Sequence, residues 1–192
     1  VARATRGLRT LHEKLQGPGA SPAAPPFGGE GSRTLPDGSL RLGTDLPLLA
    51  RRYRYVSTIS GGTSAQVIQA EDTYSALRDR VAIKIVRAQY ADQAAQEARL
   101  LRYLAAPRRG AEEPCEHVVR LLDAFAFEGH ACLVMERLYG SLADYALREV
   151  PSLPAAEALR ATRKIGAQLL ATLLYLRRRG VVHADIKPDN IL

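Results

Sequence analysis

Residues 183–192 read HADIKPDNIL, and this stretch gathers an aspartate, a lysine and an asparagine into one short segment. Lys187 follows Asp185 by two positions, Asn190 follows three positions later, and Pro188 restricts the backbone between them. Phosphoryl transfer uses these residue types: an aspartate orients an acceptor hydroxyl, a lysine meets a phosphate, and an asparagine carbonyl holds Mg2+. Each residue taken singly is more often a solvated surface residue, so the inference depends on the ordered set.

This stretch resembles the catalytic loop of eukaryotic protein kinases, written H-R-D-L-K-P-E-N. The resemblance implies that Asp185 and Lys187 are catalytic and that Asn190 is a metal ligand. A lysine two positions after the aspartate looks like the serine/threonine form of the loop. Ala184 departs from the pattern, because many kinases have an arginine there that receives an activation-loop phosphate. We therefore expect activity that does not depend on that pairing.

A second motif is the β-branched run Val-Ala-Ile-Lys, which ends at Lys84. An unpaired ammonium among apolar residues is costly, so Lys84 requires an anionic partner. Glu97 is the candidate, because it lies in an amphipathic helix pattern over residues 91–105. The motif resembles the kinase V-A-I-K strand, which implies that Glu97 holds Lys84 on the α- and β-phosphates of ATP. The alternative is a strand-end lysine and a surface glutamate without a shared role.

Two strand patterns flank a glycine-containing turn at residues 60–64, and such turns can bring backbone N–H groups close to phosphates. Alignment with the kinase Gly-rich loop, G-x-G-x-x-G-x-V, places Val67 at the final valine. Ser60, Gly62 and Ala65 then occupy the three glycine positions, and only Gly62 matches. Alone this signal is weak, and its value comes from its position before the Lys84 strand.

Residues 135–138 resemble the kinase hinge, which binds the adenine base. The resemblance implies that Met135 limits the depth of the adenine site and that backbone groups of Glu136 and Leu138 bond the adenine edge. It also implies that three apolar side chains enclose the ring: Val67, Ala82 and Leu192. Each of these apolar residues could equally be ordinary core.

The resemblance covers about residues 53–192 and implies an α+β, protein kinase-like fold. We expect an N-lobe over about 53–136, with a five-stranded antiparallel sheet and one helix, followed by the first helices of a truncated C-lobe over 137–192. Further strand patterns lie at 81–86, 118–122 and 131–135, and helix patterns at 141–148 and 155–179, the last capped by Gly180. The D-F-G metal ligand and the activation segment would lie beyond Leu192, so these residues alone are expected to be inactive.

Residues 1–52 are predicted to be a disordered basic tail, because the Pro/Gly-rich run within residues 16–45 buries little apolar surface. Residues 1–15 could also be a transit-type targeting peptide, although a solvated tail is favoured. The net charge is +7, yet no aromatic-interleaved basic motif supports direct nucleic-acid binding. No apolar run is long enough for a membrane span. Cys115 and Cys132 form neither a metal spacing nor a disulfide framework, and Cys132 fits a core strand.

The resemblance implies ATP-dependent phosphorylation of serine or threonine hydroxyls on a protein substrate, with ATP and Mg2+. The loop string is similar to pre-mRNA-processing and homeodomain-interacting kinases, in the dual-specificity tyrosine-regulated branch of the CMGC group. That similarity implies splicing or transcription assemblies as partners and favours the nucleus over the cytoplasm. The alternative is a pseudokinase or scaffold, which Ser60 and Ala65 favour and the retained polar residues oppose.

Overall fold

A computed structural model of the chain describes residues 33–107 and 113–192. These residues fall into two compact units: a sheet unit of residues 33–106 and 119–137, and a helical unit formed by the rest. The predictions for residues 1–32 lie outside the described residues. Within the described ranges, no helix combines the length and apolar character that crossing a membrane requires.

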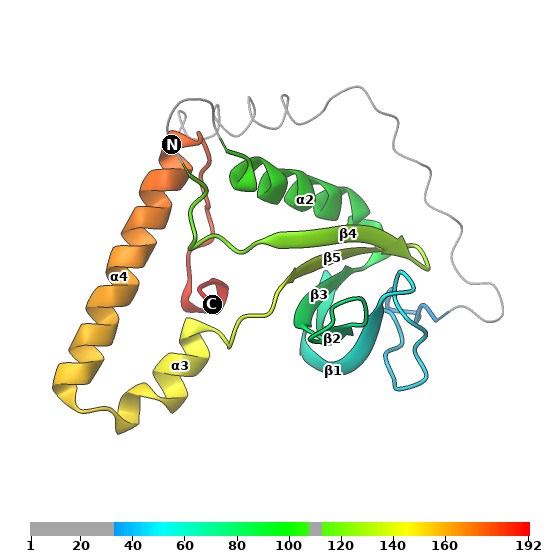
Figure 1. Ribbon diagram of the computed structural model, residues 1–192, viewed down its shortest axis with the longest axis horizontal. Helices are drawn as coiled ribbons and strands as arrows, with labels where there is room; N and C mark the ends of the chain where they lie inside the picture. The colour runs from blue at the N-terminus through cyan, green and yellow to red at the C-terminus, as the bar shows by residue number, and fades with distance from the viewer. Residues whose placement is uncertain (1–32, 108–112) are drawn as a thin grey trace. The chain divides into compact units, whose positions relative to one another are not determined.

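The sheet unit contains the five antiparallel strands that the sequence predicts, and their spatial order is β1-β2-β3-β5-β4 (Figure 1). The strands are β1 (Tyr53–Gly61), β2 (Ala65–Asp72), β3 (Arg80–Val86), β4 (Leu121–Phe127) and β5 (His130–Glu136). A short 3-10 helix, η1 (Ala88–Tyr90), leads into α2 (Ala91–Ala105), which lies against β4 and β5. The expected sheet with one helix is therefore present.

The two faces of β3 differ in character, because successive residues of a strand point to opposite sides. Val81, Ile83 and Ile85 are buried in the main hydrophobic cluster, whereas Ala82 and Lys84 alternate with them and are only partly buried. Cys132 of β5 is fully buried in the same cluster, which confirms its predicted core position. Burial raises the pKa of the Cys132 thiol to about 12, so this thiol is protonated and unreactive.

Residues 33–49, which we call the strap, pack on the core face of the sheet, although the sequence analysis placed them in the tail. Leu40 and Leu49 are fully buried and Leu46 is nearly so, all in the cluster that contains Ile83. Their irregular spacing gives no helix or strand period, so the Pro/Gly-rich composition dominated the prediction. The sequence Leu-Pro-Asp-Gly-Ser at 35–39 is a turn signal, and Gly38 takes the positive φ that this turn requires.

Strand β4 lies further along the chain than the pattern at residues 118–122 predicts. It ends in a two-residue hairpin connection to β5, in which Glu128 and Gly129 both have positive φ. Positive φ at both positions belongs to the turn type whose twist matches a β-hairpin. Because Phe127 pairs with His130, the residues that immediately precede the turn become the strand.

The helical unit contains α3 (Leu142–Arg148), η2 (Val150–Ser152), α4 (Ala155–Arg178) and η3 (Pro188–Asn190). Ser141 caps α3, since its hydroxyl accepts a hydrogen bond from the Asp144 N–H at 3.1 Å. At the end of α4, Gly180 takes a φ of 71°, and the Val181 N–H donates to the Leu176 carbonyl at 2.8 Å. This is a Schellman motif, and it confirms Gly180 as the helix cap.

Candidate active site

Four of the residues expected around ATP project from one face of the sheet. Val67 of β2 lies opposite Lys84 of β3, and Ala82 of β3 lies opposite Met135 of β5. Directly opposed residues in antiparallel strands share a face, and residues two apart in one strand do so as well. The pairing therefore brings Val67, Ala82, Lys84 and Met135 together on the face opposite the buried core.

Lys84 is held by Glu97 of α2, as the sequence predicts. The Lys84 ammonium donates to both carboxylate oxygens of Glu97, at 2.8 and 2.6 Å. The side chains are 28% and 36% exposed, so the pair is partly shielded but still reachable by a ligand. Glu97 reaches the sheet because Ala94 and Ala98 on the same helix are buried and bring α2 close. One ammonium is thus fixed in position above the sheet.

The Gly-rich turn, defined here as residues 61–64, connects β1 to β2. The Gly62 N–H donates to the Ala65 carbonyl at 2.8 Å. A Cβ built on Gly61 meets nothing within 4 Å, and one built on Gly62 meets only the Ala65 carbonyl, at 3.7 Å. The backbone of this turn therefore does not require glycine at either position. What glycine provides is uncovered backbone that a ligand can approach closely.

At the end of β5, the Glu136 side chain is occupied within the sheet unit. Its carboxylate accepts hydrogen bonds from the backbone N–H of Arg120 at 2.8 Å and from the Arg120 guanidinium at 3.1 Å. The Glu136 N–H donates to the Arg120 carbonyl at 3.2 Å. An adenine contact at Glu136 would consequently use its carbonyl group. Leu138 and Leu192 belong to the helical unit, and their predicted adenine contacts stay predictions.

In the helical unit, the three polar residues of the 183–192 stretch form one network. The Asn190 side-chain amide donates to the Asp185 carboxylate at 2.8 Å and to the Asp185 carbonyl at 2.9 Å. The Lys187 ammonium lies 3.2 Å from the same carboxylate oxygen, Oδ2. Helix η3 makes this possible, because it curls the chain back so that Asn190 faces Asp185. The segment ends on a hydrogen bond from the Leu142 N–H to the Ile191 carbonyl, at 2.7 Å.

The same contacts favour the ionised form of Asp185. The hydrogen bond from Lys187, followed by the one from Asn190, holds the pKa of Asp185 below its usual value. Asp185 is therefore ionised at neutral pH and can accept a hydrogen bond from an incoming hydroxyl. The contacts with Lys187 and Asn190 both fall on Oδ2, which leaves Oδ1 to face that hydroxyl.

The oxygen atoms available in this segment suit a metal ion that keeps most of its water and phosphate ligands. Asn190 gives its NH2 group to Asp185, so its carbonyl oxygen faces away and can coordinate a metal. The described part of the chain holds no cluster of three or more His, Cys, Asp or Glu side chains that could form a complete metal site. Mg2+ fits such a partial site, because it usually takes one or two protein oxygens together with water and phosphate oxygens.

Ala184, which departs from the kinase pattern, has a left-handed backbone with a φ of 63°. This conformation costs a non-glycine residue on the order of 1 kcal/mol. The left-handed conformation of Ala184 turns the chain between His183 and Asp185. As a result, the Asp185 N–H donates a hydrogen bond to the His183 ring at 3.3 Å. Strained backbone of this kind is concentrated at functional sites.

Sequence reasoning missed two residues beside the Gly-rich turn. Arg87, which follows β3, donates from its guanidinium to the Gly62 carbonyl at 3.2 Å. Gln66, near the start of β2, bonds the backbone of Leu40 in the strap. Neither residue belongs to a kinase motif. The turn signal at 35–39 is the only sequence feature near their partners in the strap, Asp37 and Leu40.

Comparison with known proteins agrees with this geometry. Residues 53–192 match the family described as the protein kinase domain. The chain is 35% identical over 150 residues to the probable serine/threonine-protein kinase clkA of Dictyostelium discoideum, covering 75% of this chain and 15% of that protein. It is 34% identical over 146 residues to the serine/threonine-protein kinase AFC3 of Arabidopsis thaliana, covering 75% of this chain and 34% of that protein.

A third relative is the dual specificity tyrosine-phosphorylation-regulated kinase 3 of Mus musculus, with 32% identity over 146 residues, 75% of this chain and 24% of that protein. The chain thus spans between 15% and 34% of the length of these relatives. They bear out the predicted branch of the kinases. Since the family match contains both the Lys84–Glu97 pair and the Asp185 network, the chain belongs to the protein kinase family.

Proposed function

We propose that the protein transfers the γ-phosphoryl group of ATP to serine or threonine hydroxyls of a protein substrate. The observation that carries this proposal is the network of Asp185, Lys187 and Asn190, in which each polar group is oriented by another. A pseudokinase need not keep an ionised aspartate, a lysine beside it and an amide oxygen turned outward.

Each group then has a part in the transfer. Lys84, held by Glu97, binds the non-transferred phosphates, and Asp185 accepts the proton of the acceptor hydroxyl as its oxygen bonds the γ-phosphorus. Lys187 stabilises the charge on the transferred group while the bond to the β-phosphate oxygen breaks. Asn190 would hold Mg2+, which neutralises phosphate charge when bound.

The preference for serine or threonine is supported by Lys187 and by the names of the relatives, which are serine/threonine or dual-specificity kinases. Tyrosine phosphorylation would be a further activity of the same site. A peptide library that offers serine, threonine or tyrosine as the only acceptor would measure this preference directly.

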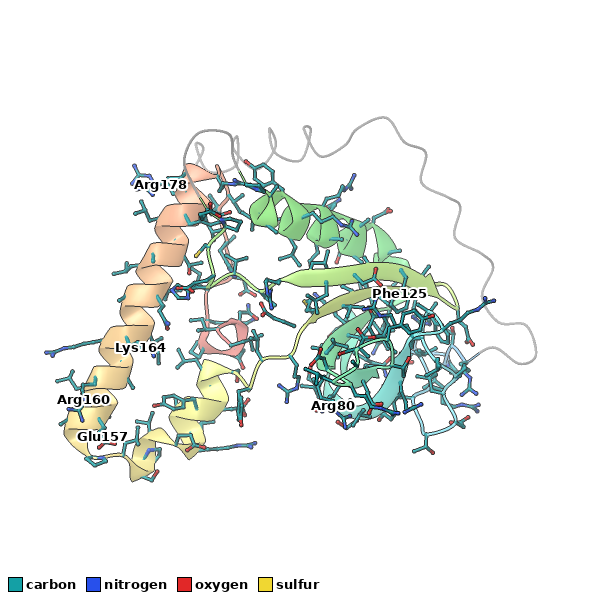
Figure 2. All side chains as sticks on the ribbon, viewed as in Figure 1. Arg80, Phe125, Glu157, Arg160, Lys164 and Arg178 are labelled. Atoms are coloured by element: carbon teal, nitrogen blue, oxygen red, sulfur yellow. The ribbon has the colours of Figure 1, made fainter. Side chains whose placement is uncertain are left out.

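The test is phosphoryl transfer by a protein that contains these residues together with the D-F-G and activation segments of the kinase family, measured with labelled ATP and that library. We expect Asp185→Asn to lower the rate by about 10²- to 10⁴-fold, because the oriented proton acceptor is lost. Glu157→Gln makes the same carboxylate-to-amide change on exposed α4 and should leave the rate unchanged (Figure 2). Transfer that survives Asp185→Asn would contradict the proposal. ATP binding without transfer by the wild-type protein that carries those segments would favour a scaffold.

We also propose a nuclear location and partners in splicing or transcription assemblies. Support comes from the similarity of the catalytic-loop string to pre-mRNA-processing and homeodomain-interacting kinases. A fluorescent fusion of the full chain and proximity labelling in cells would test both points. An exclusively cytoplasmic signal would rule the nuclear location out.

A further inference from the structure

The strap is joined to the sheet beside the Gly-rich turn by polar contacts as well as by buried leucines. The Gln66 amide accepts a hydrogen bond from the Leu40 N–H at 2.9 Å and donates one to the Leu40 carbonyl at 3.2 Å. Gln66 pairs with Gly61 across the β1–β2 hairpin. The strap is therefore bonded to a side chain of the residue that pairs with Gly61, immediately beside the turn.

Arg87 connects the strap to the turn itself. Its guanidinium donates to the Asp37 carbonyl at 2.7 Å and to the Gly62 carbonyl at 3.2 Å, and it lies 3.3 Å from the Asp37 carboxylate. The Arg87 backbone N–H donates to the Ser64 carbonyl at 2.9 Å. The side chain is only 18% exposed, so water competes weakly for these contacts. One residue thus contacts the Gly-rich turn at both Gly62 and Ser64.

The strap is itself a rigid anchor for Arg87. The Asp37 carboxylate accepts hydrogen bonds from the N–H and the hydroxyl of Ser39, at 3.0 and 2.6 Å. Gly38 has a φ of 79°, and a Cβ there would lie 2.8 Å from the Gln89 side-chain oxygen. A larger residue is therefore strained at this position by the positive φ, and the Gln89 side chain would have to move aside. At its start, the strap is bonded to β5 through Thr34 and His130, at 3.0 Å.

We propose that Arg87 is a positioning residue which, anchored by the strap, presets the Gly-rich turn for the phosphates of ATP. This inference rests on the proposed function, because it takes the turn as the phosphate-binding element. The turn residues 61–64 are exposed, so the sheet gives them little packing. By holding the Gly62 carbonyl, Arg87 fixes the direction of the neighbouring peptide groups before ATP arrives. Preorganisation of this kind increases affinity by reducing the ordering cost of binding.

The test compares two ligands of the full chain: ATP with Mg2+, and adenosine, which lacks phosphates. Arg87→Met should weaken ATP binding by about three- to tenfold, which corresponds to the net free energy of one or two hydrogen bonds. Adenosine binding should stay unchanged. Gly38→Ala, which touches no ligand, should act in the same direction. The two changes combined should have no more effect than Arg87→Met alone, because both act through one contact. Arg78→Met, on an exposed arginine paired with Glu71, is the matched control and should change neither affinity.

Hydrogen exchange separates this inference from the proposed function. Arg87→Met and Gly38→Ala should each accelerate exchange of the Gly62 amide, whether or not a nucleotide binds. If the wild-type chain binds neither ligand, the proposed function fails, and the exchange rates still decide whether Arg87 orders the turn. Unchanged exchange, or equal losses of ATP and adenosine affinity, would overturn the positioning role.

Discussion

Lys84 and Asp185 are held in opposite ways by the two units of the chain. Lys84 depends on distant parts of the sequence: its strand is paired on both sides, and its partner Glu97 lies on a helix. Asp185 is held by Lys187 and Asn190, both within five residues. The first arrangement requires a folded core, and the second requires only a short segment with the correct turns.

Burial follows the same division. In the sheet unit, Leu40, Leu49, Ile68, Ile83 and Val134 are all completely buried. Among the described residues of the helical unit, the buried apolar side chains are Tyr175, Leu176 and Val181, and Leu170 of α4 is 69% exposed. The sheet unit should therefore be far more sensitive to loss of apolar volume.

The largest expected effect tests this difference directly. Ile83→Ala removes a fully buried side chain from the central strand and should lower the free energy of unfolding by about 2–5 kcal/mol. Leu170→Ala on exposed α4 should change it by less than about 0.5 kcal/mol. Urea unfolding followed by circular dichroism measures both. Equal losses would show that the two units do not differ in packing.

The second prediction asks whether the strap belongs to the sheet unit energetically. Leu49 is completely buried, whereas its neighbour Leu48 is 38% exposed. Leu49→Ala should cost about 2–3 kcal/mol, because it leaves a cavity against the sheet. Leu48→Ala is the matched control and should cost well under 1 kcal/mol. If Leu49→Ala had no effect on urea unfolding, the strap would not be part of the core.

A third prediction contrasts two glycines of the helical unit. Gly166 lies inside α4 with open space around its Cα, so Gly166→Ala should stabilise the helix by about 0.5–1 kcal/mol. Gly180 has a φ of 71° in the helix cap, so Gly180→Ala should destabilise it by about 1 kcal/mol. Thermal unfolding at 222 nm should show shifts of opposite sign. Shifts of the same sign would contradict the cap geometry.

The smallest expected effect concerns pH. His130 is buried, donates a hydrogen bond from Nδ1 to the Val86 carbonyl, shares one with the Thr34 hydroxyl through Nε2, and is subject to the charge of Glu128. Burial holds the pKa of His130 below its ordinary value of 6.5, despite the opposing effects of Val86 and Glu128. The unfolded chain then binds a proton that the folded chain does not, so stability falls as pH drops below about 6.5.

The measurement is the melting temperature of the wild-type chain and of His130→Gln between pH 7.5 and 5.5. The wild-type melting temperature should decline over this range, and the variant should decline less. An identical slope in both proteins would show that His130 does not titrate on unfolding.

The elements with strong local signals could be predicted from sequence. The alternation around Lys84, the amphipathic pattern around Glu97 and the glycine after α4 gave β3, α2 and the helix cap. The strap and the true span of β4 could not be predicted in this way. Leu40, Leu46 and Leu49 have no period of their own, and they become core residues only because a sheet face lies beneath them. The position of β4 in the chain is set by the hairpin that pairs Phe127 with His130.

The candidate site likewise contains features that local sequence predicts and features that depend on long-range packing. The amino-acid sequence by itself determined the Asp185 network, because its members are close enough for local turns to bring them together. It also identified Lys84 and Glu97, through motifs that resemble those of kinases. Only the tertiary structure decided the strand register that brings Val67 and Met135 to the face of Ala82 and Lys84, and that Arg87 joins the strap to Gly62. Strand register and long-range packing create these contacts, and neither leaves a trace in local residue spacing.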